Sequence, residues 1–344
     1  MYLRTLSDLE DTRFDGKTVL VRVDFNVSIN NGAIGEDYRI RMSLPTIEYL
    51  AKRGAKVILA SHLGRPRGHD ERYSIAPVAK RLTEIIGRSR PPIRFASDCV
   101  GVEIEEQIEK MNKGDILLLE NLRFHKQEES NDPEFSKKLA SLADIYVNDA
   151  FSTSHRKHSS TYGTAWMFDI RLAGFNLIKE VKYLSMIREN PIRPFTLVLG
   201  GVKIKDKIGA LEHLLPKADK VIVGGAAAYT FLKAKGLKTG NSIIDQEHIQ
   251  WVEKAISTYG DKILLPTDHL CANSPNDSSV TMVSGDIPAE MSGFDIGNET
   301  VERYSAEVGS NGGGALFWNG PMGMFEKPPF DQGTRAVAQA VAEA

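Results

Sequence analysis

The chain has 344 residues and a formal net charge of -2, from 43 Lys and Arg against 45 Asp and Glu. This balance argues against a broad surface for nucleic acid or for an anionic membrane, because either surface needs a basic excess. The length exceeds the usual size of a single core, so we expect about two domains.

The N-terminus and the cysteines indicate where the protein resides. Residues 1–10 include acidic side chains and no apolar signal-peptide core, and the chain has no run of roughly eighteen apolar residues. Cys99 and Cys271 stand far apart without a CxxC partner, which disfavours a disulfide framework and a cysteine zinc site. We expect a soluble, cytoplasmic protein.

Short runs rich in Val, Ile and Leu alternate with segments of helical period through the first half of the chain. This alternation is typical of repeated βαβ units and a mostly parallel sheet. The predicted strands are 19–27, 56–60, 93–96, 116–120 and 145–148. The predicted helices are 44–53, 76–86, 102–111 and 133–142.

A further helix is predicted over 176–189, where apolar residues recur at three- and four-residue spacing. Pro191 and Pro194 end it, because the residue before a proline is pushed out of the helical region. The sequence therefore predicts a connecting helix and hinge between two lobes. These parts are an N-terminal lobe at 1–175, the connector at 176–190 and a C-terminal lobe at 191–344.

The second half begins a new βα series. Its predicted strands are 195–199, 220–223, 262–266 and 315–318. We expect loops at 292–300 and 309–314, and a last helix from Thr334 onward.

Four predicted strands of the first half end in segments with basic and amide side chains. Carboxyl ends of parallel strands meet at one edge of a sheet, so these segments are expected to converge on one small anion. Arginine suits carboxylate or phosphate through its planar fork, and histidine adds a donor whose charge is adjustable near neutrality. The segments are 21–26, 61–65, 120–123, and 148–149 leading to His155 and Arg156.

Less specific interpretations of these segments stay open. Arg22, Asp24 and Asn26 alternate with apolar residues, which is also typical of an edge strand with one solvated face. A His and an Arg on a loop are usually solvated. A metal at His155 and His158 is disfavoured, because no further ligand stands nearby at suitable spacing.

Glycines follow two predicted strands of the second half. Gly200-Gly201 precedes Lys203 and Lys207, an arrangement that predicts free backbone N–H groups for phosphate oxygens. Gly224-Gly225 would let a flat ligand such as adenine lie against the backbone, or would serve close packing of helix on strand. The GxxxxGK[ST] and GxGxxG patterns are absent, so neither a P-loop nor a standard dinucleotide fingerprint is present. In a third turn, at 318–326, Glu326 could accept hydrogen bonds from a ribose.

In chain order, these motifs resemble those of phosphoglycerate kinase from Thr18 to about Ala336. The matching segments are 21–27, 39–41, 44–47, 61–66, 120–125, 146–151 with His155 and Arg156, 200–207, 229–232 and 318–326. The resemblance implies an α/β fold of two Rossmann-like three-layer α/β/α lobes with mostly parallel sheets, joined by a connecting helix.

The resemblance also implies a set of site residues. The 3-phosphoglycerate contacts would be Asp24, Phe25, Asn26, Arg39, His62, Leu63, Gly64, Arg65, Arg123 and Arg156. The nucleotide contacts would be Gly201, Lys203, Lys207, Gly224, Gly225, Asn319, Pro321 and Glu326. Arg39, Lys203 and Lys207 would be catalytic, the first two on the transferring phosphoryl group.

The implied reaction is reversible, in-line transfer of a phosphoryl group from 1,3-bisphosphoglycerate to ADP, giving 3-phosphoglycerate and ATP with closure of the lobes. Mg²⁺ would be carried by the nucleotide. The implied partners are these small molecules, without nucleic acid or membrane, and a monomer is expected.

Departures from the family leave alternatives open. Ser28 stands where proline is usual, Ser152 and Ser154 replace glycine and alanine, and the chain stops at Ala344. Family members continue with another strand, a magnesium-binding aspartate and a tail, so the resemblance implies that these are absent. The hypotheses are an active kinase or a 3-phosphoglycerate-binding protein without turnover. A nicotinamide oxidoreductase is disfavoured by the missing GxGxxG.

Overall fold

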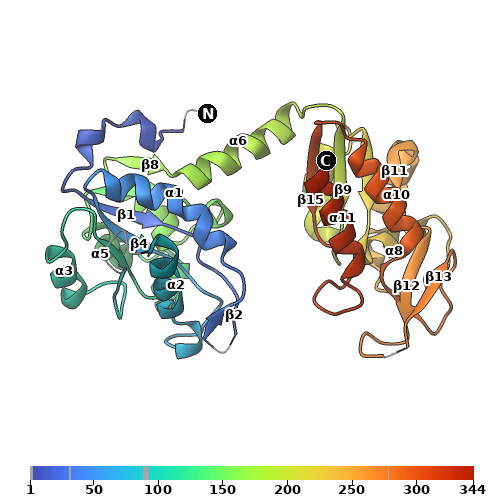
Figure 1. Cartoon of the computed structure of the whole chain (residues 1–344), viewed down its shortest axis with the longest axis horizontal. Helices are drawn as coiled ribbons and strands as arrows, with labels where there is room; N and C mark the ends of the chain where they lie inside the picture. Colours follow the sequence, from blue (N-terminus) through green and yellow to red (C-terminus); the bar gives the residue numbers. More distant parts are fainter. Residues whose placement is uncertain (1–2, 31, 88–92, 278) are drawn as a thin grey trace. The chain divides into compact units, whose positions relative to one another are not determined.

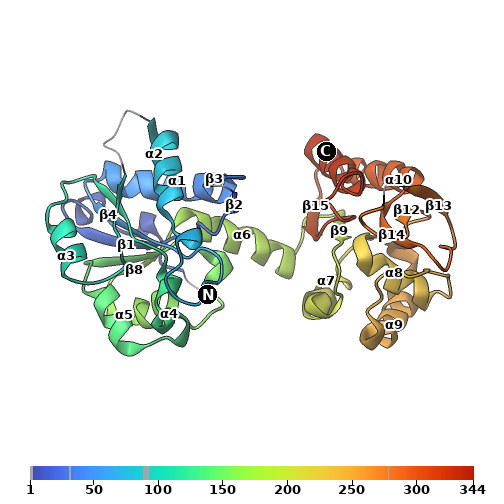
Figure 2. The same cartoon turned by 90° about the horizontal axis from the view of Figure 1, so that it is seen from below.

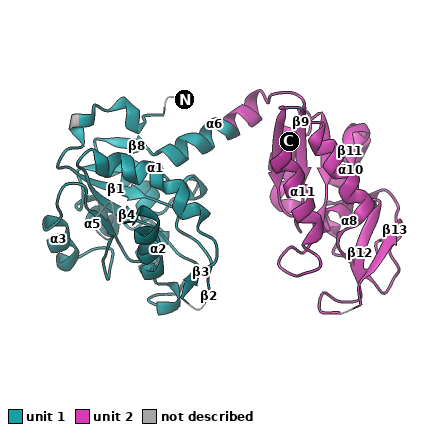
Figure 3. Cartoon of the chain, viewed as in Figure 1, with its two compact units in different colours: residues 1–183 teal, residues 184–344 magenta. Residues whose placement is uncertain are grey.

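The computed structural model describes residues 3–30, 32–87, 93–277 and 279–344 (Figure 1). The chain divides into two compact units, Met1–Tyr183 and Leu184–Ala344 (Figure 3). The division falls within α6 (Phe175–Glu189), which confirms the helix predicted over 176–189. The lobe limits at 175 and 191 stay a prediction.

Within the described residues, unit 1 contains a parallel sheet of order β5-β6-β4-β1-β7-β8. β1 lies between β4 and β7, with Val19 and Val21 in one core and Leu20 in the other. The alternative of an edge strand is therefore wrong, and β1 ends at Arg22 instead of continuing to 27. The strands are β1 (Thr18–Arg22), β4 (Lys56–Ala60), β5 (Arg94–Phe95), β6 (Ile116–Leu118), β7 (Ile145–Asn148) and β8 (Arg171–Ala173).

Helices cover both faces of this sheet. Ile47 of α1 and Leu82 of α2 belong to one core, and Ile104 of α3 and Leu139 of α5 belong to the other. The helix predicted over 44–53 begins earlier, at Tyr38, and contains Pro45. The helices are α1 (Tyr38–Lys52), α2 (Ala76–Ile86), α3 (Val102–Glu109), α4 (Lys126–Ser130) and α5 (Pro133–Ala140), and β2 (Ile29–Asn30) pairs with β3 (Ala33–Ile34).

Unit 2 has a parallel sheet of order β11-β10-β9-β15, with helices on both faces (Figure 2). Leu197 and Val221 lie in the core with α7, α8 and α9, whereas Val198 and Ile222 lie in the core with α10 and α11. The strands are β9 (Phe195–Leu199), β10 (Lys220–Val223), β11 (Ile263–Leu264) and β15 (Ala315–Asn319). The helices are α7 (Ile208–Leu214), α8 (Gly225–Ala234), α9 (Ile249–Tyr259), α10 (Asn298–Gly309) and α11 (Gln332–Glu343). Over the described residues, no helix combines the length and the apolar character needed to cross a membrane.

The loop predicted at 292–300 is wrong, because this segment forms β14 (Ser292–Ile296) and the start of α10. β14 joins β12 (Asp268–Ala272) and β13 (Thr281–Ser284) in an antiparallel sheet of order β13-β12-β14. Ser, Gly and Asp have low strand propensity, but contacts with distant parts of the chain stabilise the strand here. Gly293 lies against Tyr229, whose hydroxyl would be 2.1 Å from an added Cβ.

Candidate functional site

The segments that follow β1 and β4 are joined by hydrogen bonds at the carboxyl edge of the first sheet. The backbone N–H of Phe25 donates to Ser61 Oγ at 2.9 Å, and the N–H of Gly64 donates to Asn26 Oδ1 at 2.9 Å. Parallel pairing aligns the two strands, so their ends meet although they are far apart in the sequence. These bonds bring together Phe25, Asn26 and Gly64, which are three of the predicted 3-phosphoglycerate contacts.

Asp24 is a buried acceptor that positions Arg39. Its Oδ1 accepts from the N–H of Asn26 at 3.1 Å, and its Oδ2 accepts from Ser152 Oγ at 2.5 Å and pairs with Arg39. Arg39 lies in the first turn of α1 and keeps 47% of its side chain exposed. Asp24 therefore holds a guanidinium at the sheet edge where it remains accessible to an anion. Ser152, a departure from the family pattern, supplies a bond that a glycine could not.

Arg22 is fully inside unit 1 and fixes the state of His62. The Arg22 guanidinium donates to Ser160 Oγ at 2.8 Å and lies 3.2 Å from His62 Nδ1. Arginine offers no acceptor, so Nδ1 accepts this bond and the ring proton resides on Nε2. Burial, followed by the charges of Arg22 and Arg123, lowers the pKa of His62 to about 2. The predicted adjustable charge is therefore wrong, and His62 is a neutral Nε2–H donor at physiological pH.

A buried carboxylate compensates the charge of Arg22. Glu128 accepts from the backbone N–H of Ser160 at 2.9 Å and from its hydroxyl at 2.6 Å, while Ser160 Oγ accepts from Arg22. Burial lowers the pKa of Arg22, and Glu128 opposes that effect. The sequence identified Arg22 as a charge in an apolar strand but gave no sign of its Ser160–Glu128 partners.

The segment after β6 is held by Asn121, a residue missing from the predicted contacts. Its Oδ1 accepts from the N–H groups of Leu63 and Arg123 at 3.1 Å each, and its amide donates to the Leu63 carbonyl at 2.8 Å. Arg123 donates to the carbonyl of Gly64 at 2.6 Å and pairs with Glu129 at 3.2 Å. Hydrogen bonds therefore join the segment that follows β4 to the segment that follows β6.

The two remaining predicted arginines differ from this group. Arg156 lies close enough for its charge to lower the pKa values of His62 and Arg123. Arg65 is exposed next to Gly64, and in the described part of the chain it makes no hydrogen bond or ion pair with the other predicted contacts.

Asp149, at the end of β7, caps the helix that leaves unit 1. Its Oδ1 accepts from the N–H groups of Asn176 at 2.9 Å and Leu177 at 3.3 Å, in the first turn of α6. Burial raises the pKa of Asp149 to about 7, against the opposing effect of the nearby Thr46 hydroxyl and these N–H groups. A cap normally prefers the ionised carboxylate, so burial and capping act in opposite directions here.

The Asp149→Asn variant is expected to flatten the dependence of the unfolding free energy on pH. The folded pKa exceeds the unfolded value of 3.8, so the stabilising contribution is complete below about pH 4 and is lost as pH rises through 7. The amide does not titrate, which removes this loss of about a few kcal/mol. Urea unfolding at pH 5 and pH 8 measures the difference. The exposed Asp169→Asn serves as control, and equal pH slopes in both variants would contradict the expectation.

In unit 2, three turns meet at the carboxyl ends of β9, β10 and β15. The N–H of Gly201 donates to the Pro321 carbonyl at 2.8 Å, and that of Gly225 donates to the Met322 carbonyl at 2.7 Å. The N–H of Gly200 donates to the Asn319 carbonyl at 2.8 Å. The prediction that the N–H groups of Gly200 and Gly201 are free for phosphate is therefore wrong, because both are used to join the turns.

The lysines of this region lie at the same edge. Lys207 Nζ donates to the Lys203 carbonyl at 3.2 Å, and burial lowers the pKa of Lys207. Lys207 and Asn319 line one cavity of about 270 Å³ between α7 and the sheet. Lys203 and Glu326 are exposed. Lys207 and Asn319 supply a cation and an amide that can bind phosphate oxygens, whereas Asp206 and apolar side chains form the rest of the cavity.

Comparisons with known proteins show the family of the chain. The family model described as phosphoglycerate kinase matches residues 9–344. The chain belongs to the phosphoglycerate kinase family. It is 45% identical to the phosphoglycerate kinase of Dictyoglomus turgidum, over 100% of this chain and 86% of that protein, and 46% identical to that of Solibacter usitatus, over 97% and 85%.

Solved phosphoglycerate kinase structures share the fold. The structure from Coxiella burnetii has a TM-score of 0.78 and 37% identity, covering 100% of this chain and 86% of that one. The structure from Pyrococcus horikoshii has a TM-score of 0.86 and 30% identity, covering 99% and 86%. The predicted α/β fold class is confirmed, and the family resemblance seen in the motifs is confirmed with it.

Gly200 is expected to be essential for the contact between the turns that follow β9 and β15. A Cβ at Gly200 would lie 2.1 Å from the Pro321 carbonyl oxygen, so Gly200→Ala must displace backbone and is expected to destabilise the protein by about 3 kcal/mol or more. Gly209→Ala in α7 is the matched control, because no atom lies within 4 Å of its added Cβ. Thermal unfolding of both variants measures the effect, and equal midpoints would contradict the expectation.

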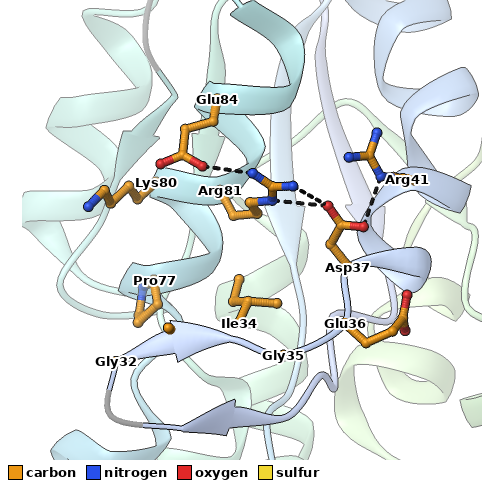
Figure 4. Close-up of a pocket in the computed structure, with 11 residues that line it drawn as sticks. Gly32, Ile34, Gly35, Glu36, Asp37, Arg41, Pro77, Lys80, Arg81 and Glu84 are labelled. Atoms are coloured by element: carbon orange, nitrogen blue, oxygen red, sulfur yellow. Dashed lines mark hydrogen bonds and ion pairs between the residues drawn. The ribbon is translucent and has the colours of Figure 1, made fainter.

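A hollow of about 600 Å³ lies elsewhere in unit 1, among the β2–β3 hairpin, the start of α1 and α2 (Figure 4). Asp37 accepts from Arg41 at 2.8 Å and from Arg81 at 2.7 Å, and Arg81 also pairs with Glu84 at 2.9 Å. Both arginines already have carboxylate partners. None of the residues lining the hollow belongs to the predicted phosphoglycerate kinase contacts.

Proposed function

We propose that this chain catalyses reversible phosphoryl transfer between ATP and 3-phosphoglycerate, with 3-phosphoglycerate on unit 1 and the nucleotide on unit 2. Membership of the phosphoglycerate kinase family supports the reaction class. The observation that carries the assignment to unit 1 is the assembly of Arg39, His62 and Arg123 at one sheet edge. Two guanidiniums and a neutral imidazole donor suit a ligand with both carboxylate and phosphate.

The contacts of the unit 1 residues support a role for each as a hydrogen-bond donor to 3-phosphoglycerate. Arg39, held by Asp24 and exposed at its guanidinium, would interact with the transferring phosphoryl group. His62 would donate from Nε2 to a substrate oxygen, because Arg22 occupies Nδ1. Asn26, Arg65, Arg123 and Arg156 would bind the remaining oxygens of 3-phosphoglycerate.

In unit 2, Lys203 would act on the transferring group and Lys207 would bind nucleotide phosphates. Gly224 and Gly225 would lie near the base, and Asn319, Pro321 and Glu326 would complete the nucleotide contacts. Mg²⁺ would enter as part of the Mg-nucleotide substrate. The loop residue Glu326 is exposed and offers a carboxylate for ribose hydroxyls.

The chemistry requires little acid–base catalysis. In the direction that consumes ATP, the nucleophile is a carboxylate that is already ionised at neutral pH, so no general base is needed. Phosphoryl transfer depends mainly on positioning and on stabilisation of charge. A site built from arginines, lysines and a neutral donor is sufficient for that task. The expected monomer, cytoplasmic location and lobe closure stay predictions.

A coupled assay tests the proposal by measuring ATP-dependent phosphorylation of 3-phosphoglycerate through oxidation of NADH by an excess dehydrogenase. Calorimetric titration with 3-phosphoglycerate and with Mg-ADP separates binding from turnover. Turnover together with binding of both ligands is the expected result. Binding of 3-phosphoglycerate without turnover would contradict the proposal.

A further inference from the structure

The loop 320–331, which follows β15, carries two of the predicted nucleotide contacts and is fixed by α11 and β14. Thr334 Oγ1, in α11, accepts from the N–H of Met322 at 3.0 Å and lies 3.4 Å from the N–H of Gly323. The N–H of Met324 donates to the Phe294 carbonyl of β14 at 2.8 Å. The rings of Phe294 and Phe330 lie 4.9 Å apart. The loop is thus held at its beginning, middle and end.

Asp295 joins these anchors. Its side chain is 1% exposed, and Oδ2 accepts from the N–H of Gly333 at 2.7 Å, in the first turn of α11. A Cβ on Gly323 would lie 2.2 Å from Asp295 Oδ1, and a Cβ on Gly333 would lie 2.4 Å from it. The carboxylate therefore packs directly on the loop and on the helix that follows it. Burial raises the pKa of Asp295 to about 7, whereas the helix dipole and the N–H groups of Gly333 and Ile296 favour the ionised carboxylate.

The loop in turn supports both glycine turns. The carbonyl of Pro321 accepts from Gly201, and the carbonyl of Met322 accepts from Gly225. Displacement of the loop near Gly323 would move these two acceptors, because Met322 and Pro321 stand one and two residues before Gly323. Asp295 therefore packs on a loop that is itself hydrogen-bonded to the turns at Gly201 and Gly225.

We propose that Asp295 is a positioning residue for the nucleotide. Its carboxylate holds loop 320–331 in the conformation that presents Pro321 and Glu326. The same conformation keeps the loop carbonyls in place for the hydrogen bonds from Gly201 and Gly225. The inference rests on the proposed function, since it assigns the loop to nucleotide binding. Asp295 acts through the loop and makes no contact with substrate itself. A family motif could not identify it, because it lies in a segment whose sequence predicts a loop.

Asp295→Asn tests this role, with Asp268→Asn as the matched control. Asp268 is also buried and also caps a helix, accepting from the N–H of Thr300 in α10 at 2.9 Å, but it packs against Gly297, whereas Asp295 packs against Gly323 of loop 320–331. Asp295 Oδ1 also accepts from the N–H of Ile296 at 2.9 Å, so in Asp295→Asn the single amide oxygen can serve only one of the two N–H donors and the NH2 group must face the other. We expect KM and Kd for Mg-ADP to rise on the order of tenfold, with KM for 3-phosphoglycerate unchanged. Asp268→Asn is expected to lower Tm and to change either KM by less than about twofold.

Amide hydrogen exchange of the two variants gives a readout that does not depend on turnover. Exchange in 320–331 is expected to accelerate in Asp295→Asn and to stay at the wild-type rate in Asp268→Asn. Should Asp295→Asn fail to fold, Thr334→Val removes the acceptor for Met322 on the same loop and must show the same KM split. Equal effects of Asp295→Asn and Asp268→Asn on nucleotide affinity would overturn the inference. A wild-type chain that binds no Mg-ADP would instead refute the proposed function.

Discussion

Replacing Arg39 with alanine is expected to lower kcat by about 100- to 1000-fold, because the variant loses the guanidinium that we propose interacts with developing charge on the phosphoryl group. The fold should be nearly unaffected. Arg39 is 47% exposed, and its partner Asp24, although only 11% exposed, keeps its hydrogen bonds from Asn26 and Ser152 when the guanidinium is removed. The coupled assay gives kcat, and thermal unfolding gives the accompanying change in stability.

Arg41→Ala is the matched control for this result. Arg41 lies in the same turn of α1, is 52% exposed and pairs with Asp37, but it faces the hollow of Figure 4. It should retain near wild-type kcat. A comparable loss in both variants would indicate a general effect of charge on the helix, and retention of kcat in Arg39→Ala would remove Arg39 from the catalytic group.

The fold could be predicted where one local signal dominates. α2 begins and ends where its apolar period predicts, and β9 and β10 match continuous apolar runs bounded by polar turns. β14 could not be predicted in the same way. Its Ser, Gly and Asp residues disfavour strands in isolation, and they are needed for contacts with residues far away in the sequence. Tertiary structure decides the conformation of that segment.

The candidate site, like the fold, could be predicted from the sequence only in part. Motifs at strand ends predict His62 and Arg123, because chemistry and position coincide there, whereas Arg39, in α1, is implied only by the resemblance to the family. The partners that set their states could not be predicted, since Ser160 and Glu128 meet Arg22 only after the sheet and α4 have packed. For the glycines of unit 2, the prediction from the sequence is wrong. Their pattern predicts free N–H groups, whereas the fold uses those groups to join neighbouring turns.

Lys203→Ala is the second large effect expected, with kcat lowered by about 100-fold or more. The backbone carbonyl of Lys203 accepts from Lys207, whereas the Lys203 ammonium makes no hydrogen bond or ion pair within the described chain. An exposed ammonium without a carboxylate partner is free to interact with a phosphoryl oxygen. Its loss should therefore leave Tm almost unchanged while the rate falls. Lys203→Arg keeps the charge and should recover only part of the rate, because a planar guanidinium cannot replace a compact ammonium at equal distance.

Lys205→Ala is the control that decides between a specific contact and local charge. Lys205 stands between the two predicted lysines and is exposed, and its backbone N–H is held by Asp245 Oδ2 at 3.2 Å. Removing its ammonium changes the net charge of the turn by the same amount as Lys203→Ala. If the rate depends on the electrostatic potential of the turn alone, the two variants must lose similar activity. If Lys203 contacts the transferring group, Lys205→Ala retains most of kcat and only Lys203→Ala loses it, because a direct contact depends on the position of the charge as well as on its sign.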